Sequence, residues 1–400
     1  MNRFELVIAG GGLTAARAIK SYREAGGGGR IALVSKESVL PYHRPALSKR
    51  YLRGETSAPF AEGEAFYRDH DVDVLLETAI TGIDLAAPSV ATDGGTLRYE
   101  KLLLATGATP RRLHVPGAEL ESVYALRTLQ DSDAIRAAAR GTQRAVVVGG
   151  GFIGMEVASS LRQLNLDVTL VHLGRGLFDQ LGSPELSDQL LDLYREHGVD
   201  VLLQQEITRF GGDGRLESAE ASSGLCVEAD LAVIGIGVIP ETAFLANSGL
   251  TLDNGVVVDE RFQTGAPGVY AAGDIANFYD PLYGRQRRIE HWSNANYQGG
   301  EVGKIIAGQG GGYDTVSSFF SEVFGTTIKV FGDTSGADQL TADGSLESGN
   351  FLAGYGDGGR LLGAISVGQS EELEALLKDL IAERAPADAL ARELIGSGSR

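Results

Sequence analysis

Two glycine-rich turns constrain the fold of this chain more than any other sequence feature. One reads Gly-Gly-Gly-Leu-Thr-Ala over residues 10–15, and the other reads Gly-Gly-Gly-Phe-Ile-Gly over residues 149–154. Each follows an apolar, β-rich run and precedes a helical pattern, a setting in which backbone N–H groups at a helix N-terminus can hold a pyrophosphate. A single such turn is weak evidence, since an ordinary β-to-α turn also needs glycine. Two in one chain predict two bound dinucleotides.

The composition indicates a globular protein of several domains. With 400 residues, 43% of them hydrophobic, the chain is too long for one core and should form two or three domains. No apolar run approaches the roughly 20 residues that span a bilayer, and a strand begins too early for a secretory signal. We therefore expect a cytoplasmic protein. Its net charge of −18 argues against nucleic-acid or anionic-membrane binding.

A single cysteine limits the redox chemistry of the chain. Cys226 has no partner for an intrachain disulfide or for a multi-cysteine metal site, and paired-thiol chemistry is excluded. We expect no metal. Because Cys226 lies in an apolar run that continues to Ile239, we expect its side chain to be buried and without chemistry.

The order of apolar runs predicts an α/β fold with two Rossmann-like units and a C-terminal α+β domain. The first unit opens with a strand, a helix and a strand over residues 4–9, 13–24 and 31–35. A second alternating unit covers about residues 123–240 and looks like an inserted domain. From about residue 313 the pattern is strand-rich, and it ends in two helices over about 370–384 and 386–395.

Two carboxylates follow predicted strands of the first unit. Glu37 stands about where a dinucleotide ribose needs a hydrogen-bond acceptor, although Lys36 beside it weakens that assignment. A later strand ends in Gly273-Asp274, and a helix begins at about residue 291. Such a strand end can place a carboxylate against a polyol while the helix aims its N-terminus at an anion. An ordinary strand-to-turn aspartate is the alternative.

These motifs together resemble the FAD-dependent pyridine nucleotide oxidoreductases. In particular, the chain is similar to the ferredoxin reductases that serve bacterial oxygenases, relatives of putidaredoxin reductase, apoptosis-inducing factor and monodehydroascorbate reductase. The narrower markers are residues 41–49, 104–107, 151–156, 270–274 and 290–292. The resemblance implies an FAD domain over residues 1–113 and 243–315, an NAD(P)H domain over 114–242, and a C-terminal α+β domain over 316–400.

Carried onto this chain, the resemblance implies two sets of cofactor contacts. The FAD set is Gly10, Gly12, Ala15, Glu37, Arg44, Lys49, Thr106, Gly107, Arg127, Gly273, Asp274, Glu290, His291, Trp292 and Phe320. The nicotinamide set is Gly149, Gly151, Phe152, Ile153, Gly154, Glu156, His172, Arg175 and Gly237. Lys49 and Glu156 form the predicted catalytic pair. A lysine near flavin N5, held by a glutamate, would stabilise negative charge on the reduced ring.

Two departures from the family pattern affect the predicted substrates. Phe320 stands where ferredoxin reductases usually have tryptophan, which loosens the inference about the electron acceptor. His172, with Arg175 after it, stands where NADH-specific members place a carboxylate. A carboxylate would repel a 2′-phosphate and these two side chains would not, so we expect NADPH to serve at least as well as NADH. The alternative is that another group binds the ribose hydroxyl.

The predicted reaction is reduction of FAD by NADH or NADPH, followed by electron transfer to a small acidic iron-sulfur protein of the ferredoxin type. Arg285, Arg287 and Arg288 could steer such a partner, unless they form an ordinary solvated loop. One alternative is a reductase of a small acceptor such as a quinone, a radical or oxygen. Another is a redox scaffold like apoptosis-inducing factor. We expect a monomer or a homodimer.

Overall fold

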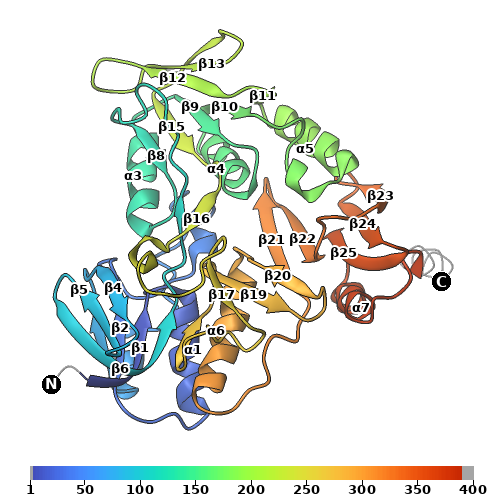
Figure 1. Cartoon of the computed structure of the whole chain (residues 1–400). Helices are drawn as coiled ribbons and strands as arrows, with labels where there is room; N and C mark the ends of the chain where they lie inside the picture. The colour runs from blue at the N-terminus through green and yellow to red at the C-terminus, as the bar shows by residue number, and fades with distance from the viewer. Residues whose placement is uncertain (1–2, 390–400) are drawn as a thin grey trace. The chain divides into compact units, whose positions relative to one another are not determined.

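The computed structural model describes residues 3–389, which fall into two compact units (Figure 1). Unit 1 comprises Met1–His43, Ala58–Thr109 and Val238–Thr315, and unit 2 comprises Arg44–Ser57, Pro110–Gly237 and Val316–Arg400. The short segment Arg44–Ser57 therefore belongs to unit 2, although the predicted FAD domain includes it. The predicted assignment of domains to cofactors stays a prediction.

Unit 1 is built on a seven-stranded sheet of order β3-β2-β1-β6-β5-β4, with β18 paired to β6. Its central pairs are parallel, and β4 and β5 add an antiparallel extension. The strands are β1 Arg3–Ala9, β2 Ile31–Val34, β3 Val72–Leu75, β4 Ile80–Asp84, β5 Ser89–Thr92, β6 Gly95–Leu104 and β18 Val269–Ala271. Strands β1 and β2 are largely buried on both faces, which explains their continuous apolar runs.

The other elements of unit 1 cover and extend this sheet. They are α1 Leu13–Glu24, α2 Glu64–Asp69, the 3-10 helix η3 Ala243–Leu245, α6 Trp292–Ile306, and the strands β7 Ala108–Pro110, β16 Val238–Pro240, β17 Val256–Val258, β19 Ala276–Asp280 and β20 Arg285–Arg287. Strands β17, β19 and β20 form a small sheet, and β7 pairs with β16.

Helices α1 and α6 pack closely because α6 presents glycines to α1. A Cβ on Gly299 would lie 2.6 Å from the carbonyl oxygen of Thr14, and one on Gly303 would lie 2.4 Å from that of Ala18. Gly300, between them, has open space where a Cβ would stand. The backbones can therefore approach only at the two glycines that face α1.

Unit 2 contains a five-stranded parallel sheet of order β11-β10-β9-β15-β8. Its strands are β8 Val123–Ala125, β9 Arg144–Val148, β10 Asp167–His172, β11 Val199–Leu203 and β15 Leu231–Ile234. Its helices are α3 Leu129–Ala139, α4 Phe152–Gln163 and α5 Pro184–Glu196, with 3-10 helices η1 Arg44–Ala46 and η2 Asp179–Leu181. A three-stranded antiparallel sheet of β12 Ile207–Gly211, β13 Ser218–Ala221 and β14 Cys226–Glu228 is added.

The C-terminal part of unit 2 is an antiparallel sheet of order β21-β22-β25-β24-β23 with one helix, α7 Glu371–Ala382, packed on it. Its strands are β21 Ser318–Val323, β22 Thr326–Gly332, β23 Gln339–Ser345, β24 Asn350–Asp357 and β25 Arg360–Val367. Strand β21 also packs against α4 of the parallel part. This contact brings C-terminal side chains to the second glycine turn.

The predicted α/β class with a C-terminal α+β part is confirmed, and α1 has the predicted bounds. The expectation for Cys226 is wrong, because this residue is exposed. Glu228 and Asp230 interrupt the apolar run, so Cys226 belongs to the strand β14 and not to the buried strand β15. Residues 390–395 of the last predicted helix lie outside the described residues.

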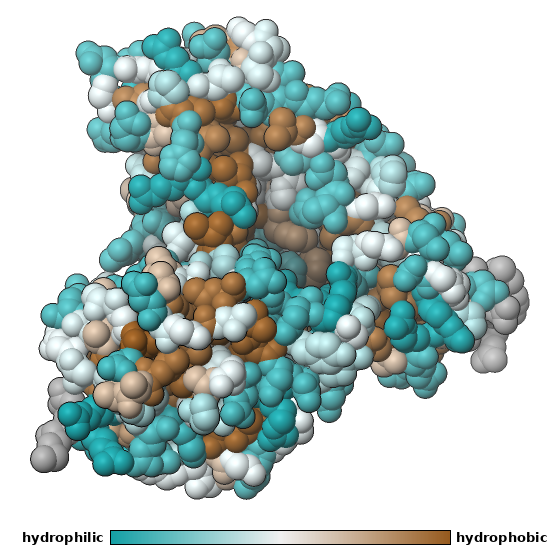
Figure 2. Space-filling model, in the orientation of Figure 1, coloured by the Kyte–Doolittle hydropathy of each residue, from teal (hydrophilic) through white to brown (hydrophobic). Residues whose placement is uncertain are grey.

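Within residues 3–389, no helix has the length and apolarity needed to cross a membrane. On the face drawn in Figure 2, hydrophilic residues cover much of the surface and apolar residues reach it in separate patches. Large apolar side chains that are exposed include Ile153 and Phe320, both predicted cofactor contacts.

The packing of α1 on α6 predicts opposite effects for two neighbouring substitutions. Gly303→Ala should lower the free energy of unfolding by about 1–3 kcal/mol, because its methyl group would overlap the backbone of α1. Gly300→Ala is the matched control and should raise it by up to about 1 kcal/mol through helix propensity. Chemical denaturation of both variants measures the difference, and equal effects would contradict this account of the packing.

Candidate active site

The first glycine turn places backbone against backbone and leaves open space at the N-terminus of α1. Gly10 has φ +120°, and a Cβ there would lie 2.2 Å from the carbonyl oxygen of Ala105. Gly12, the N-cap of α1, has no atom within 4 Å of its Cβ position and no side-chain cap. Ala15, at the third position of the motif, is fully buried. The turn therefore fits a pyrophosphate that approaches Gly12.

The second turn repeats this arrangement in unit 2. Gly149 has φ +115°, and its Cβ would lie 2.2 Å from the carbonyl oxygen of Gly235. A Cβ on Gly154 would lie 1.9 Å from the carbonyl oxygen of Gly149. Near the Cβ position of Gly151, by contrast, the only close atom is Nε2 of Gln180, at 3.5 Å. This turn also fits a dinucleotide phosphate, with the outer two glycines required by the fold itself.

Predicted FAD contacts in unit 1 meet at one edge of its sheet. Strands β1, β2, β6 and β18 are parallel, so their carboxyl ends lie on the same edge. Residues that follow these ends are Gly10, Glu37, Thr106, Gly107, Gly273 and Asp274. Glu37 accepts a hydrogen bond from the Tyr42 hydroxyl at 2.6 Å, and the Thr106 hydroxyl donates to the Glu241 carbonyl at 3.0 Å. The edge carries the chemistry expected of a dinucleotide site.

The remaining predicted contacts of unit 1 lie at the start of α6. Trp292 is its first residue, is 36% exposed, and donates from Nε1 to Nδ1 of His43 at 2.8 Å. Desolvation lowers the pKa of His291, the N-cap, to about 4, so this ring is neutral at pH 7. Glu290 forms an ion pair with Arg288.

The predicted catalytic residues form a buried ion pair in unit 2. Nζ of Lys49 lies 2.7 Å from Oε2 of Glu156, and the two side chains are 7% and 5% exposed. Ser321 donates to Oε1 of Glu156 at 2.8 Å, and the Ser48 hydroxyl donates to Oε2. The carboxylate is thus held by a cation and two hydroxyl groups, which meets the need of a buried charge for partners.

Three distant segments supply this network. Lys49 and Ser48 follow η1, Glu156 lies in the first turns of α4, and Ser321 lies on β21. On β21 the neighbouring Phe320 is 42% exposed, and its ring centre is 5.8 Å from Nζ of Lys49. Sequence analysis missed the roles of Ser48 and Ser321. Ser48 lies inside a quoted motif, but nothing in the sequence connects Ser321 with Glu156.

The other predicted residues of unit 2 have separate positions. Arg44 donates from its guanidinium to the backbone oxygen of Arg127. Phe152 packs on Phe178 with ring centres 4.8 Å apart, and Ile153 is 39% exposed on the first turn of α4. Gly237 is exposed with φ +93° and accepts from the backbone N–H of Arg111.

His172 lies at the end of β10, and its partner was not predicted. Its Nε2 is 3.4 Å from Oδ1 of Asp179, while Arg175 is exposed on the intervening loop. A carboxylate is therefore present at this strand end after all. The sequence analysis missed it because Asp179 comes seven positions after the strand and reaches His172 only through the fold of the loop.

The basic cluster offers less positive surface than the sequence suggests. Arg287 pairs with buried Asp280 at 2.7 Å and is 10% exposed. Arg288 pairs with Glu290 and is 9% exposed. Of the three, only Arg285 is well exposed. The expectation of three cations available to steer an acidic partner is therefore wrong for two of them.

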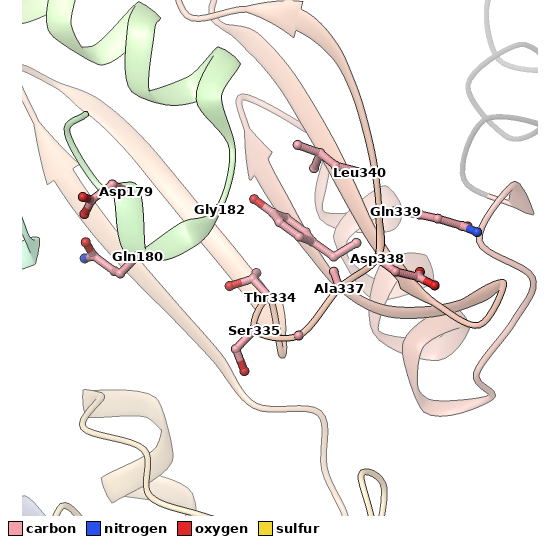
Figure 3. Close-up of a pocket in the computed structure, with 11 residues that line it drawn as sticks. Asp179, Gln180, Gly182, Thr334, Ser335, Ala337, Asp338, Gln339 and Leu340 are labelled. Atoms are coloured by element: carbon pink, nitrogen blue, oxygen red, sulfur yellow. The ribbon is translucent and has the colours of Figure 1, made fainter. Parts of the chain in front are cut away.

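A polar cavity of about 330 Å³ lies between η2 and residues 334–340 of unit 2 (Figure 3). It is lined by Asp179, Gln180, Gly182, Thr334, Ser335, Gly336, Ala337, Asp338, Gln339, Leu340 and Tyr355. None of the predicted site residues lines it, and its lining has no lysine, arginine or histidine. Such a cavity does not suit a phosphate group, so the glycine turns remain the better cofactor sites.

Comparison with known proteins agrees with this geometry. The model of the pyridine nucleotide-disulphide oxidoreductases matches residues 4–299, and the reductase C-terminal model matches residues 318–393. The chain belongs to the pyridine nucleotide-disulphide oxidoreductase family. This membership confirms the predicted oxidoreductase class and its cofactors, FAD and a nicotinamide nucleotide.

Individual relatives match along almost their full length. Putidaredoxin reductase of Pseudomonas putida is 32% identical over 392 residues, which cover 96% of this chain and 93% of that protein. The ferredoxin reductase of the CYP199A2 system from Rhodopseudomonas palustris is 31% identical with a TM-score of 0.91, covering 97% and 96%. The reductase in a covalent putidaredoxin reductase–putidaredoxin complex is 30% identical with a TM-score of 0.92, covering 100% and 99%.

The geometry of the second turn predicts different effects for two glycine substitutions, one on nucleotide binding and the other on stability. Gly151→Ala should fold normally but bind a nicotinamide nucleotide more weakly, because its methyl group would occupy open space at the helix N-terminus. Gly154→Ala should instead lower the free energy of unfolding, because its Cβ would collide with the Gly149 carbonyl. Thermal melting together with NAD titration separates the two, and normal NAD affinity in Gly151→Ala would contradict the assignment.

Proposed function

We propose that this chain is an FAD-dependent reductase that takes a hydride from a nicotinamide nucleotide and passes electrons to a small ferredoxin-type iron-sulfur protein. One observation carries the proposal: two dinucleotide turns occur in a chain with only one cysteine. A single thiol cannot form the redox disulfide that would relay electrons inside one chain. The electrons must therefore leave the flavin for an external acceptor.

The nature of the acceptor is supported by the relatives. Similar proteins include ferredoxin and rubredoxin reductases, and one solved relative is joined covalently to putidaredoxin. The expected small acidic partner would find little positive charge at this cluster, because Arg287 and Arg288 form ion pairs within the chain. The monomeric or homodimeric state and the cytoplasmic location stay predictions.

The cofactors supply the chemistry, which is hydride transfer from nicotinamide to flavin followed by electron transfer. The chain's own residues would orient the two cofactors and stabilise the reduced flavin. Backbone N–H groups beside Gly12 and Gly151 would hold the pyrophosphates of the two cofactors. Lys49 would supply positive charge next to the flavin, and Glu156 holds its ammonium group in place.

A second candidate is the reduction of a small planar acceptor such as a quinone. The observation in its favour is Phe320, which is 42% exposed beside Lys49 and is smaller than the tryptophan usual in ferredoxin reductases. Such a ring can stack on a planar molecule without a protein partner.

We expect the Lys49–Glu156 pair to act as a unit. Lys49→Ala and Glu156→Ala should each slow reduction of bound flavin by about 10²-fold, and the double variant should lose less than the two losses combined. Lys329→Ala is a matched control, because Lys329 forms a 2.7 Å pair with Glu374 elsewhere in unit 2. Stopped-flow absorbance measures these rates. Strict additivity, or an equal loss in the control, would show that the pair has no special role.

We expect the purified protein to be yellow and to release FAD on acid precipitation. After anaerobic reduction by NADH, a panel of ferredoxins, quinones and oxygen should reoxidise it at different rates, with an iron-sulfur protein the fastest. Stopped-flow traces at the flavin absorbance decide this. Fastest reoxidation by a quinone would select the second candidate, and slow reoxidation by every acceptor would favour a redox scaffold.

A further inference from the structure

The loop after β10 folds back so that a carboxylate reaches the end of that strand. Oδ1 of Asp179 lies 3.4 Å from Nε2 of His172. A Cβ on Gly174, in the loop between them, would lie 1.9 Å from Oδ2 of Asp179 and 2.4 Å from Nε2 of His172. The absence of a side chain at Gly174 therefore lets the loop close over this pair.

The position of Asp179 is fixed by its neighbour Phe178. The Phe178 N–H donates to the carbonyl oxygen of Gly150 at 3.0 Å, and its ring packs on Phe152. Phe178 is 1% exposed and has φ +53°, a conformation that bulky residues seldom adopt. Strained backbone of this kind persists where the surroundings hold it firmly, often at functional sites. Asp179 is thereby tied to the second glycine turn.

Asp179 also remains accessible on the side of that turn. Its side chain is 39% exposed. The next residue, Gln180, places Nε2 3.5 Å from the Cβ position of Gly151, where the nucleotide phosphate would approach. In Figure 3 the side chains of Asp179 and Gln180 extend to the same side, away from Thr334 and Ser335. Asp179 lines the polar cavity, and its partly exposed carboxylate also stands next to the residue that reaches the second glycine turn, where a nucleotide would approach.

In a βαβ dinucleotide unit, a carboxylate near the end of the second strand accepts from the adenosine ribose and repels a 2′-phosphate. We propose that Asp179 performs this task here and makes the protein prefer NADH, with His172 as a positioning residue. This inference rests on the proposed function only in taking the second turn as the nicotinamide nucleotide site. It reverses the NADPH preference expected from His172 and Arg175, because the carboxylate is anchored beside the strand end while Arg175 is exposed on the loop.

Binding of two nucleotide fragments tests the proposal without catalysis. Calorimetric titration of the FAD-loaded protein should give ADP-ribose an affinity about ten- to a hundredfold higher than 2′-phospho-ADP-ribose. Asp179→Asn should abolish most of this preference, and Asp179→Glu should keep it. His172→Ala should weaken it partly, through the dissociation constants and not through kcat. Asp188→Asn, an equal charge change on exposed α5, is the control and should behave as wild type.

The outcomes separate this inference from the proposed function. Stopped-flow reduction of the flavin by NADH and NADPH is measured on the same variants, and thermal melting confirms that each is folded. A wild type that favours the phosphorylated fragment, or equal behaviour of Asp179→Asn and Asp188→Asn, would overturn the role of Asp179 while flavin reduction stayed intact. Failure of both nucleotides to bind or to reduce the flavin would overturn the proposed function, and this inference with it.

Discussion

At the first glycine of each turn, the backbone lies in close contact with the backbone of another segment. Both Rossmann-like units depend on this contact. A Cβ at Gly10 would lie 2.2 Å from the Ala105 oxygen, and one at Gly149 would lie 2.2 Å from the Gly235 oxygen. In both units the turn passes against the residue that follows a neighbouring parallel strand, β6 or β15. The approach sets where the next helix begins. It also leaves Gly12 and Gly151 facing open space at the helix N-termini, where an anion is stabilised.

The buried carboxylate of Glu156 connects segments that are distant in the sequence. It accepts from the adjacent residues Ser48 and Lys49 and from Ser321, which lies far away in the sequence. A buried carboxylate is destabilised when it loses one of its hydrogen-bond donors, because the remaining donors do not fully replace the lost interaction. Such a network therefore favours a fold in which all of its segments stay together. This explains how the short segment after η1 and strand β21 can lie in one compact unit with α4. The same network keeps the Lys49 ammonium in one position.

Charge pairing inside the molecule changes what its surface can recognise. Arg287 and Arg288 are the partners of Asp280 and Glu290, and each is largely buried. Asp179 differs from these buried pairs. Its carboxylate is partly exposed and lies beside His172. The first arrangement withdraws positive charge from partner recognition. The second makes a negative charge available to a nucleotide.

The sequence by itself determined the features that depend on local patterns. The first helix, α1, has its predicted bounds, the second glycine turn directly precedes α4, and buried parallel strands such as β1 and β9 appear as continuous apolar runs. Polar strands with weak alternation, such as β4, β12 and β14, gave no comparable signal, and Cys226 was placed wrongly for that reason. Only the tertiary structure decided that Ser321 reaches Glu156 and that Asp179 reaches His172. Those contacts depend on how a sheet packs on a helix and how a loop folds back, and side-chain spacing along the chain carries no record of either.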